Sequence, residues 1–278
     1  MFKNIDKNNE IFKSDTYRKD VVPFQLLELI KENPIMLVSD EKSFVIGASH
    51  PEMPVWVWTS DEIEDDTKTK LAKWFYEYFE KDKTKFSLVA KPETAKLLAE
   101  PFVKNKNPKV SVVNMQSYKN EKIIPPKNKD AVIEVPAEKD VLSIAELLRN
   151  FSLECFGSAL PSNDEYVNTA KKLLSDRYCR IIKENGKAVA MARSSRENEE
   201  FVAVNGVYTA PEYRRKGYAS AIVAHISGLI LQNGKTPALY TDLSNPSSNR
   251  AYKNIGFTEQ APIDQIYLDW SINNESAN

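Results

Sequence analysis

The stretch Val207-Tyr-Thr-Ala-Pro-Glu-Tyr-Arg-Arg-Lys-Gly-Tyr-Ala219 decides the fold of the chain. Residues 201–208 are rich in β-branched and aromatic side chains, which favours a strand. Pro211 ends that strand, because proline has no N–H for a ladder. From Gly217 onward, apolar side chains recur at helical spacing until the stop signal at Asn233. The stretch therefore predicts a strand, a short turn and a helix that begins at the glycine.

The turn has the composition of an anion site. Arg214, Arg215 and Lys216 supply three positive charges, and Gly217 lets the backbone approach a bulky ligand. The first turn of a helix also carries free N–H groups and the positive end of the helix dipole. A single glycine fits neither a Walker loop nor a dinucleotide fingerprint. A phosphate or pyrophosphate is the expected guest, and the alternative is an ordinary turn with surface cations.

A second stretch, from Asn245 to Phe257, follows a strand-like run at residues 239–243. Asn245 or Ser244 can cap a helix, Pro246 suits its first position, and Gly256 can end it. This stretch therefore predicts a short helix after the next strand.

Together the two stretches resemble the GNAT superfamily of acyl-CoA-dependent N-acyltransferases, in a two-domain bacterial subgroup. The family signature Arg/Gln-x-x-Gly-x-Gly/Ala matches Arg214, Gly217 and Ala219. Its signature Asn-Pro-x-Ser-Asn-x-x-Tyr-x-x-x-Gly-Phe matches residues 245–257. Two ordered motifs at a sensible separation are more specific than either motif alone.

The resemblance implies acetyl-CoA as co-substrate, with no metal, and assigns residues to it by position. The backbone of Val207, Tyr208 and Thr209 is expected along the pantetheine arm. The residues expected around the pyrophosphate are Arg214, Arg215, Lys216, Gly217, Tyr218, Ala219 and Ser220. Asn245 and Asn249 are assigned to cofactor binding, with capping and ordering of the short helix as the alternative. A bulge at Asn205-Gly206 would splay two strands to admit the arm, and the alternative is a flexible strand end.

The same resemblance implies attack of an amine on a thioester. Tyr252 lies where the family keeps its tyrosine general acid, and its alternative role is helix packing. An N–H near Val207 could stabilise the oxyanion. Some relatives have a glutamate base where this chain has Ala203, so that assignment fails here. Glu200, Glu154 and a chain of water molecules are the substitutes, and an amine that is already partly neutral would need no base. Asp242 either orients the site or ends a strand.

Composition bounds the remaining possibilities. The chain has 278 residues, 42% hydrophobic and 28% charged, and a net charge of −1, which gives no global attraction to nucleic acid or membranes. Cys155 and Cys179 are too few for a disulfide framework and are expected to be buried thiols. Neither His50 nor His225 has neighbours at metal-ligand spacing. No apolar run reaches the length of a membrane span, and the first residues do not form a signal peptide.

We predict an α/β (α+β) protein with two domains. The segment Lys119 to Asp130 is charged, contains a Pro-Pro pair and is the best linker. Residues 129–278 are expected to form a GNAT domain with a mixed, mostly antiparallel central sheet. Residues 1–128 alternate strands and helices and form a second α/β domain, for which a degenerate copy of the GNAT fold is one interpretation. The clustered aromatic residues Trp56, Trp58, Trp74, Tyr76 and Tyr78 are expected in its core.

The leading functional prediction is a cytoplasmic N-acetyltransferase that acts on a small-molecule or peptide amine, as a monomer or homodimer. The rival is a non-catalytic acyl-CoA sensor or interaction module on a retired enzyme fold, which the alanine at position 203 favours. A third reading, aminoacyl transfer, needs a basic surface for its RNA-borne donor, which the net charge does not indicate. The acceptor site is expected in loops such as residues 154–163.

Overall fold

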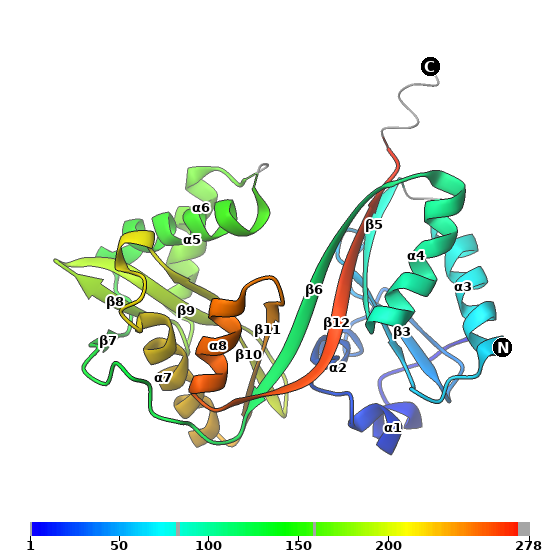
Figure 1. Ribbon diagram of the computed structural model, residues 1–278, viewed down its shortest axis with the longest axis horizontal. Coiled ribbons are helices and arrows are strands. Elements are labelled where there is room, and N and C mark those ends of the chain that lie inside the picture. Colours follow the sequence, from blue (N-terminus) through cyan, green and yellow to red (C-terminus); the bar gives the residue numbers. More distant parts are fainter. Residues whose placement is uncertain (1, 82–83, 158–159, 272–278) are drawn as a thin grey trace. The chain divides into compact units, whose positions relative to one another are not determined.

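The computed structural model describes residues 2–81, 84–157 and 160–271 (Figure 1). The chain forms two compact units, each assembled from several segments. Unit 1 contains Met1–Ser117, Tyr240–Ser244 and Gln260–Asn278, and unit 2 contains Tyr118–Leu239 and Asn245–Glu259. The division into domains at residue 128, made from the sequence, stays a prediction. Residues 158–159, in the middle of the predicted acceptor loop 154–163, lie outside the described residues.

The first half of the chain runs through one series of elements. They are β1 (Lys3–Asn4), the 3-10 helix η1 (Glu10–Lys13), α1 (Asp15–Arg18), α2 (Gln25–Ile30), β2 (Met36–Ser39), β3 (Phe44–Ala48), β4 (Val55–Thr59), α3 (Asp65–Phe79), β5 (Lys85–Ala90), α4 (Pro92–Lys106) and β6 (Lys109–Asn120).

The second half repeats this order. Its elements are β7 (Ile133–Glu134), η2 (Glu138–Asp140), α5 (Val141–Phe156), α6 (Asn163–Leu173), β8 (Arg180–Glu184), β9 (Lys187–Glu197), β10 (Phe201–Thr209), η3 (Pro211–Tyr213), α7 (Tyr218–Gln232), β11 (Thr236–Asp242), α8 (Pro246–Asn254) and β12 (Phe257–Asp269). Within each half the first four strands pair antiparallel in succession, and the fourth pairs parallel to the fifth. The two halves therefore share one topology, although no internal repeat is visible in the sequence.

The strands form a mixed sheet in the order β1-β2-β3-β4-β5-β12-β6-β11-β10-β9-β8-β7. Most of the described pairings are antiparallel, as predicted, and β4–β5 and β10–β11 are parallel. The last strand of the second half, β12, pairs antiparallel with β5 of the first half through Asp264↔Ala90 to Asp269↔Lys85. Strands β6, β11 and β12 contribute residues to both units.

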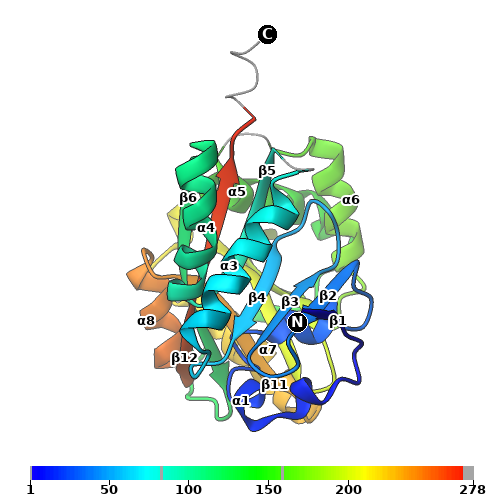
Figure 2. The ribbon, with the colours of Figure 1, turned by 90° about the vertical axis from the view of Figure 1, so that its right-hand side faces the viewer.

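Unit 1 has a core on each face of its strands. Helices α3 and α4 cover one face, where Leu71 and Phe102 are fully buried (Figure 2). The 3-10 helix η1 and helices α1 and α2 cover the other face and enclose Trp58. The expectation of aromatic core packing is confirmed for Trp56 and Trp58 but is wrong for Tyr78, which is half exposed.

Unit 2 is also covered on both faces (Figure 1). Helices α5 and α6 pack on one side of β8–β10, and α7 and α8 pack on the other. The neighbours Ile181 and Ile182 on β8 point to opposite cores, as the two-residue repeat of a strand requires. The dipeptide Asn185-Gly186, a favoured two-residue hairpin turn, joins β8 to β9, and both residues have a positive φ.

Several sequence-based expectations need correction. The polar and charged composition of residues 1–20 predicts a partly mobile N-terminus, but Ile11 and Tyr17 are buried because they pack in one core with α2. Cys179 is buried as predicted, whereas Cys155 is exposed near the end of α5. Within the residues that the structure describes, no helix has both the length and the apolar character needed to cross a membrane.

Candidate functional site

The site begins at a bulge in β10. Asn205 pairs with Arg193 of β9, and Tyr208 pairs with Met191, so β10 contains one residue more than its partner over this interval. The parallel pairing of β10 with β11 runs only from Phe201 to Ala203. The predicted bulge at Asn205-Gly206 is therefore confirmed, and the end of β10 diverges from β11.

A tight turn joins β10 to α7. Arg215 and Gly217 both have left-handed backbone conformations, with φ of 65° and 79°, and α7 begins at Tyr218. The first backbone hydrogen bond of α7 is donated by the Ala221 N–H to the Gly217 carbonyl, at 3.0 Å. The N–H groups of residues 218–220 have no acceptor among the described residues. This arrangement leaves several donors at the positive end of a 15-residue helix, which suits an anion.

The glycine in this turn has a close neighbour from the predicted linker. An added Cβ at Gly217 would lie 3.2 Å from the Cβ of Asn128, and the Asn128 amide donates to the Lys216 carbonyl at 2.8 Å. Asn128 thus orients the carbonyl side of the turn, leaving the N–H side open. Nothing in the linker sequence distinguishes Asn128 from its polar neighbours.

Arg214 is engaged within the protein. Its Nη2 donates to both oxygens of Glu154, at 2.6 and 2.8 Å, and its Nε donates to the Thr209 carbonyl at 3.0 Å. The Tyr208 hydroxyl donates to the same Glu154 carboxylate at 2.8 Å. Burial and the neighbouring Glu154 raise the pKa of Tyr208 to about 12. Glu154, which lies in the last turn of α5, therefore ties that helix to both the strand and the turn.

The other two cations of the turn differ from Arg214. Lys216 lies 5.1 Å from the centre of the Tyr213 ring, and its ammonium is 3.9 Å from Glu184. Arg215 is exposed and has no ion pair or hydrogen bond to any described residue. The turn thus has one free guanidinium, one loosely paired ammonium and one guanidinium held by Glu154.

Tyr252 lies on α8 and is buried. Its ring contacts Phe257 edge-on, with centroids 5.9 Å apart, and burial raises the pKa of its hydroxyl. The hydroxyl is protonated at neutral pH with or without this shift, and the raised pKa makes it a weaker acid than an exposed tyrosine.

The two asparagines of the second motif hold α8. The Asn245 side chain caps the helix by accepting the Ser248 N–H at 3.1 Å, as predicted. Asn249 accepts from the Tyr118 hydroxyl at 2.8 Å and donates to the Asn245 carbonyl at 2.7 Å. Both amides thus have contacts within the protein, and their assignment to the cofactor stays a prediction.

The remaining acid–base residues lie in varied surroundings. Ala203 is buried where some relatives have a glutamate, and Glu200 is exposed at the start of β10. The Asp242 carboxylate accepts the Ser244 N–H at 2.7 Å, which is a turn contact. His225 is exposed on α7. Glu154, by contrast, is in direct contact with Tyr208 at the end of β10 and with Arg214 in the turn.

Comparisons with known proteins agree with this geometry. Residues 145–257 match the model of the acetyltransferase (GNAT) family. A comparison with curated proteins found no match. Among solved structures, the chain is similar to a GCN5-related N-acetyltransferase from Sphaerobacter thermophilus, with 11% identity over 97% of this chain and 95% of that one and a TM-score of 0.63. It is also similar to a GCN5-related N-acetyltransferase from Kribbella flavida (14% identity, 92% and 96% covered, TM-score 0.57) and to a Drosophila protein (12%, 96% and 98%, 0.64). At these identities the likeness shows the fold alone, and it extends over nearly the whole chain.

Proposed function

Since residues 145–257 belong to the acetyltransferase (GNAT) family, we propose that the chain is an acyl-CoA-dependent N-acyltransferase that moves acetyl from acetyl-CoA to a primary amine. The observation that carries the proposal is the set of free N–H groups at the start of α7, beside a strand that diverges from its neighbour. A ligand that carries phosphates and an extended arm would use both features. The free N–H groups suit its phosphates, and the unpaired strand end suits its arm.

The residues around the turn fit such a ligand. We assign the pyrophosphate to the N–H groups of residues 218–220, with charge from Arg215 and Lys216. The backbone of Val207 to Thr209 would accompany the pantetheine arm, and the buried Thr209 hydroxyl, which has no partner among the described residues, is available to it. When bound, acetyl-CoA supplies a thioester carbonyl as the electrophile.

Tyr252 is the proposed general acid. The assignment rests on the position of Tyr252 in the second motif, and its hydroxyl is protonated at neutral pH and so has a proton to give to the leaving thiolate. The Val207 N–H is proposed as the donor to the oxyanion.

For the base we favour Glu154 over Glu200. The Glu154 carboxylate lies beside Tyr208 at the end of the bulged strand, but it is paired with Arg214. A phosphate of the cofactor would compete with Glu154 for Arg214, because both are anions that suit the guanidinium fork. Cofactor binding would then release the carboxylate that accepts the amine proton.

Calorimetric titration with acetyl-CoA, beside free CoA, tests the proposal. We expect micromolar binding, about −8 kcal/mol, followed by thiol release when a panel of primary amines is added. Gly217→Glu should abolish binding, because the added carboxylate would crowd and repel the pyrophosphate. Full affinity in that variant, or no binding of wild-type protein at millimolar ligand, would overturn the assignment of the site.

A second candidate is a non-catalytic acyl-CoA sensor, which Ala203 favours because it removes the family's glutamate base. It predicts the same binding without thiol release for any amine. We further propose that the first half of the chain is a degenerate copy of the second, on the basis of their common element order. The cytoplasm as compartment, and a monomer or homodimer as the working form, are also proposals.

A further inference from the structure

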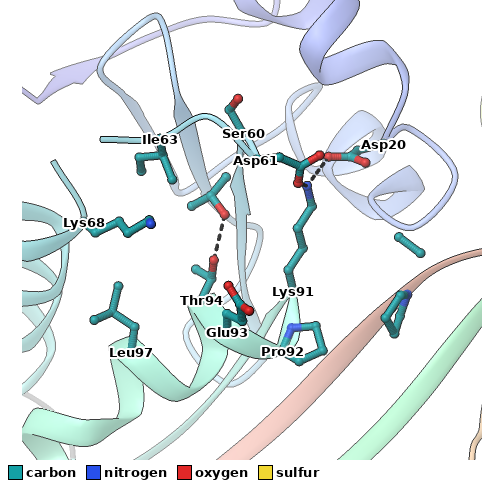
Figure 3. Close-up of a pocket in the computed structure, with 13 residues that line it drawn as sticks. Asp20, Ser60, Asp61, Ile63, Lys68, Lys91, Pro92, Glu93, Thr94 and Leu97 are labelled. Carbon is teal, nitrogen blue, oxygen red and sulfur yellow. Dashed lines mark hydrogen bonds and ion pairs between the residues drawn. The ribbon is translucent and has the colours of Figure 1, made fainter. Parts of the chain in front are cut away.

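Unit 1 contains a cavity at the position that corresponds, by topology, to the proposed acyl-CoA site of unit 2. The cavity has a volume of about 670 Å³ and lies over the ends of the parallel strands β4 and β5, at the beginnings of α3 and α4 (Figure 3). In unit 2 the corresponding elements are β10, β11, α7 and α8. Ligands of α/β sheets commonly bind at such strand ends, so a cavity here is a candidate binding site.

The cavity is unsuited to acyl-CoA. The turn that precedes α3 has no glycine, and five of the six residues from Asp61 to Asp66 are acidic, where unit 2 has three cations in succession. Strand β4 pairs with β5 as far as Val57↔Ala90, two residues before β4 ends, whereas β10 continues for six residues beyond its last pair with β11. The described part of this cavity therefore lacks both features that suit acyl-CoA in unit 2, the glycine-containing basic turn and the unpaired strand end.

One wall of the cavity already binds an ammonium group. The Nζ of Lys91 lies 2.5 Å from an oxygen of Asp20 and 2.5 Å from an oxygen of Asp61, as Figure 3 shows. Asp20 is 7% exposed and accepts a further hydrogen bond from the Trp58 indole at 2.9 Å. Hydrogen bonds from Lys19 and Lys91 hold the pKa of Asp61 below its ordinary value, so this carboxylate stays charged.

Polar groups beside that ion pair are left for a ligand. Glu93 lines the cavity from the first turn of α4 and has no hydrogen bond or ion pair to any described residue. Ser60 is only 5% exposed, and its oxygen accepts the Glu62 N–H at 3.2 Å, but its proton has no acceptor in the described part of the chain. Ile63 and Leu97 supply apolar surface.

We propose that this cavity binds an organic ammonium ion with an apolar body. The ammonium group pairs with the Glu93 carboxylate, and the body packs against Ile63 and Leu97. The lining carries three carboxylates and two ammonium groups, and the lysines Lys91 and Lys68 pair with other carboxylates, which leaves the charge of Glu93 to favour a cation over an anion. The proposal does not depend on acyl transfer in unit 2.

The test uses benzylamine as the probe, with benzyl alcohol as a neutral analogue and benzoate as an anionic one, and needs no acyl-CoA. The indole N–H resonance of Trp58, assigned with Trp58→Phe, reports on the site because this group donates to Asp20. We expect saturable shifts with benzylamine, at least about tenfold weaker binding of benzyl alcohol, and none of benzoate.

Two variants on α4 complete the experiment. Glu93→Gln should weaken benzylamine binding about two- to fivefold, because it removes the exposed charge that pairs with the ammonium. Glu100→Gln on the same helix, whose carboxylate pairs with Lys104, should leave binding unchanged. Equal binding of amine and alcohol, equal binding by Glu93→Gln and wild type, or the absence of any shift at Trp58 would overturn the proposal.

Discussion

The pairing of Arg214 with Glu154 predicts that one substitution near the site, Glu154→Gln, strengthens the binding of acetyl-CoA instead of weakening it. Glu154→Gln keeps the size of the side chain and its contact with the Tyr208 hydroxyl but removes the charge that holds Arg214. If Arg214 is shared between Glu154 and a cofactor phosphate, the variant should bind acetyl-CoA more tightly than wild type. A side chain that only fastens α5 to the turn would, when weakened, leave affinity unchanged or lower it.

The structure limits the size of the effect. The side chains of Arg214 and Glu154 are 45% and 47% exposed, and a single nitrogen, Nη2, contacts both carboxylate oxygens, so the pair is worth about 0.5 to 1 kcal/mol. The dissociation constant should therefore fall about two- to fivefold. The gain should shrink at high salt, which screens exposed charges.

A double-mutant cycle isolates the shared arginine. Arg214→Ala should weaken binding, and adding Glu154→Gln to it should change nothing further. Glu146→Gln is the matched control, since Glu146 also lies on α5 but pairs with Lys187 at 2.8 Å. The measurement is calorimetric titration with acetyl-CoA at two salt concentrations. Unchanged or weaker binding by Glu154→Gln, or a gain that persists without Arg214, would refute the competition. If Glu154 is also the base, turnover should fall in the variant whose binding improves.

Three further predictions concern single side chains. Tyr252→Phe should lower kcat about 100-fold with little change in KM, as measured by thiol release, because it removes a proton donor that acts in the transition state; an equal loss of cofactor affinity would argue for a packing role. Gly256→Ala should lower the free energy of unfolding in urea by about 2 to 4 kcal/mol, since its Cβ would lie 2.2 Å from the Lys122 carbonyl oxygen. Gly228→Ala is the control: an added Cβ there has no atom within 4 Å, so this variant should be neutral or stabilising. Burial and Glu259 raise the pKa of Tyr118 from 10.0 to about 12, so its contribution to stability is complete below pH 10 and is lost as the pH rises toward 12; Tyr118→Phe should flatten that alkaline loss, and an unchanged slope would exclude this cause.

Local patterns in the sequence predicted most of the site. The strand, the turn and the beginning of α7 follow from Pro211, Gly217 and helical spacing, and the Asn245 cap follows from its side chain. These features depend on residues close in sequence, where propensity and capping act.

The contacts that the sequence did not reveal join distant residues. Arg214 and Glu154 are 60 positions apart, and Asn128 lies 88 positions from the carbonyl that it orients. Strand β12 begins at Phe257, five residues ahead of Pro262, and this polar beginning lies beside β6, where the Ser117 hydroxyl donates to the Ala261 carbonyl. Each of these contacts depends on which strands become neighbours, which no local pattern encodes.

The common topology of the two halves sharpens the proposed function. In each unit two parallel strands are each followed by a helix, and this creates the same kind of site at the strand ends. Topology alone therefore cannot decide which ligand binds. Charge and backbone decide it: the second half has Gly217 and a basic turn, and the first half has an acidic turn and the ammonium of Lys91 between two carboxylates. Anionic ligands should therefore bind at the site in unit 2, and cationic ligands should bind at the site in unit 1. A titration with acetyl-CoA should end at one molecule per chain and stay there in Glu93→Gln, while a second equivalent would mean that the first half has kept a cofactor site.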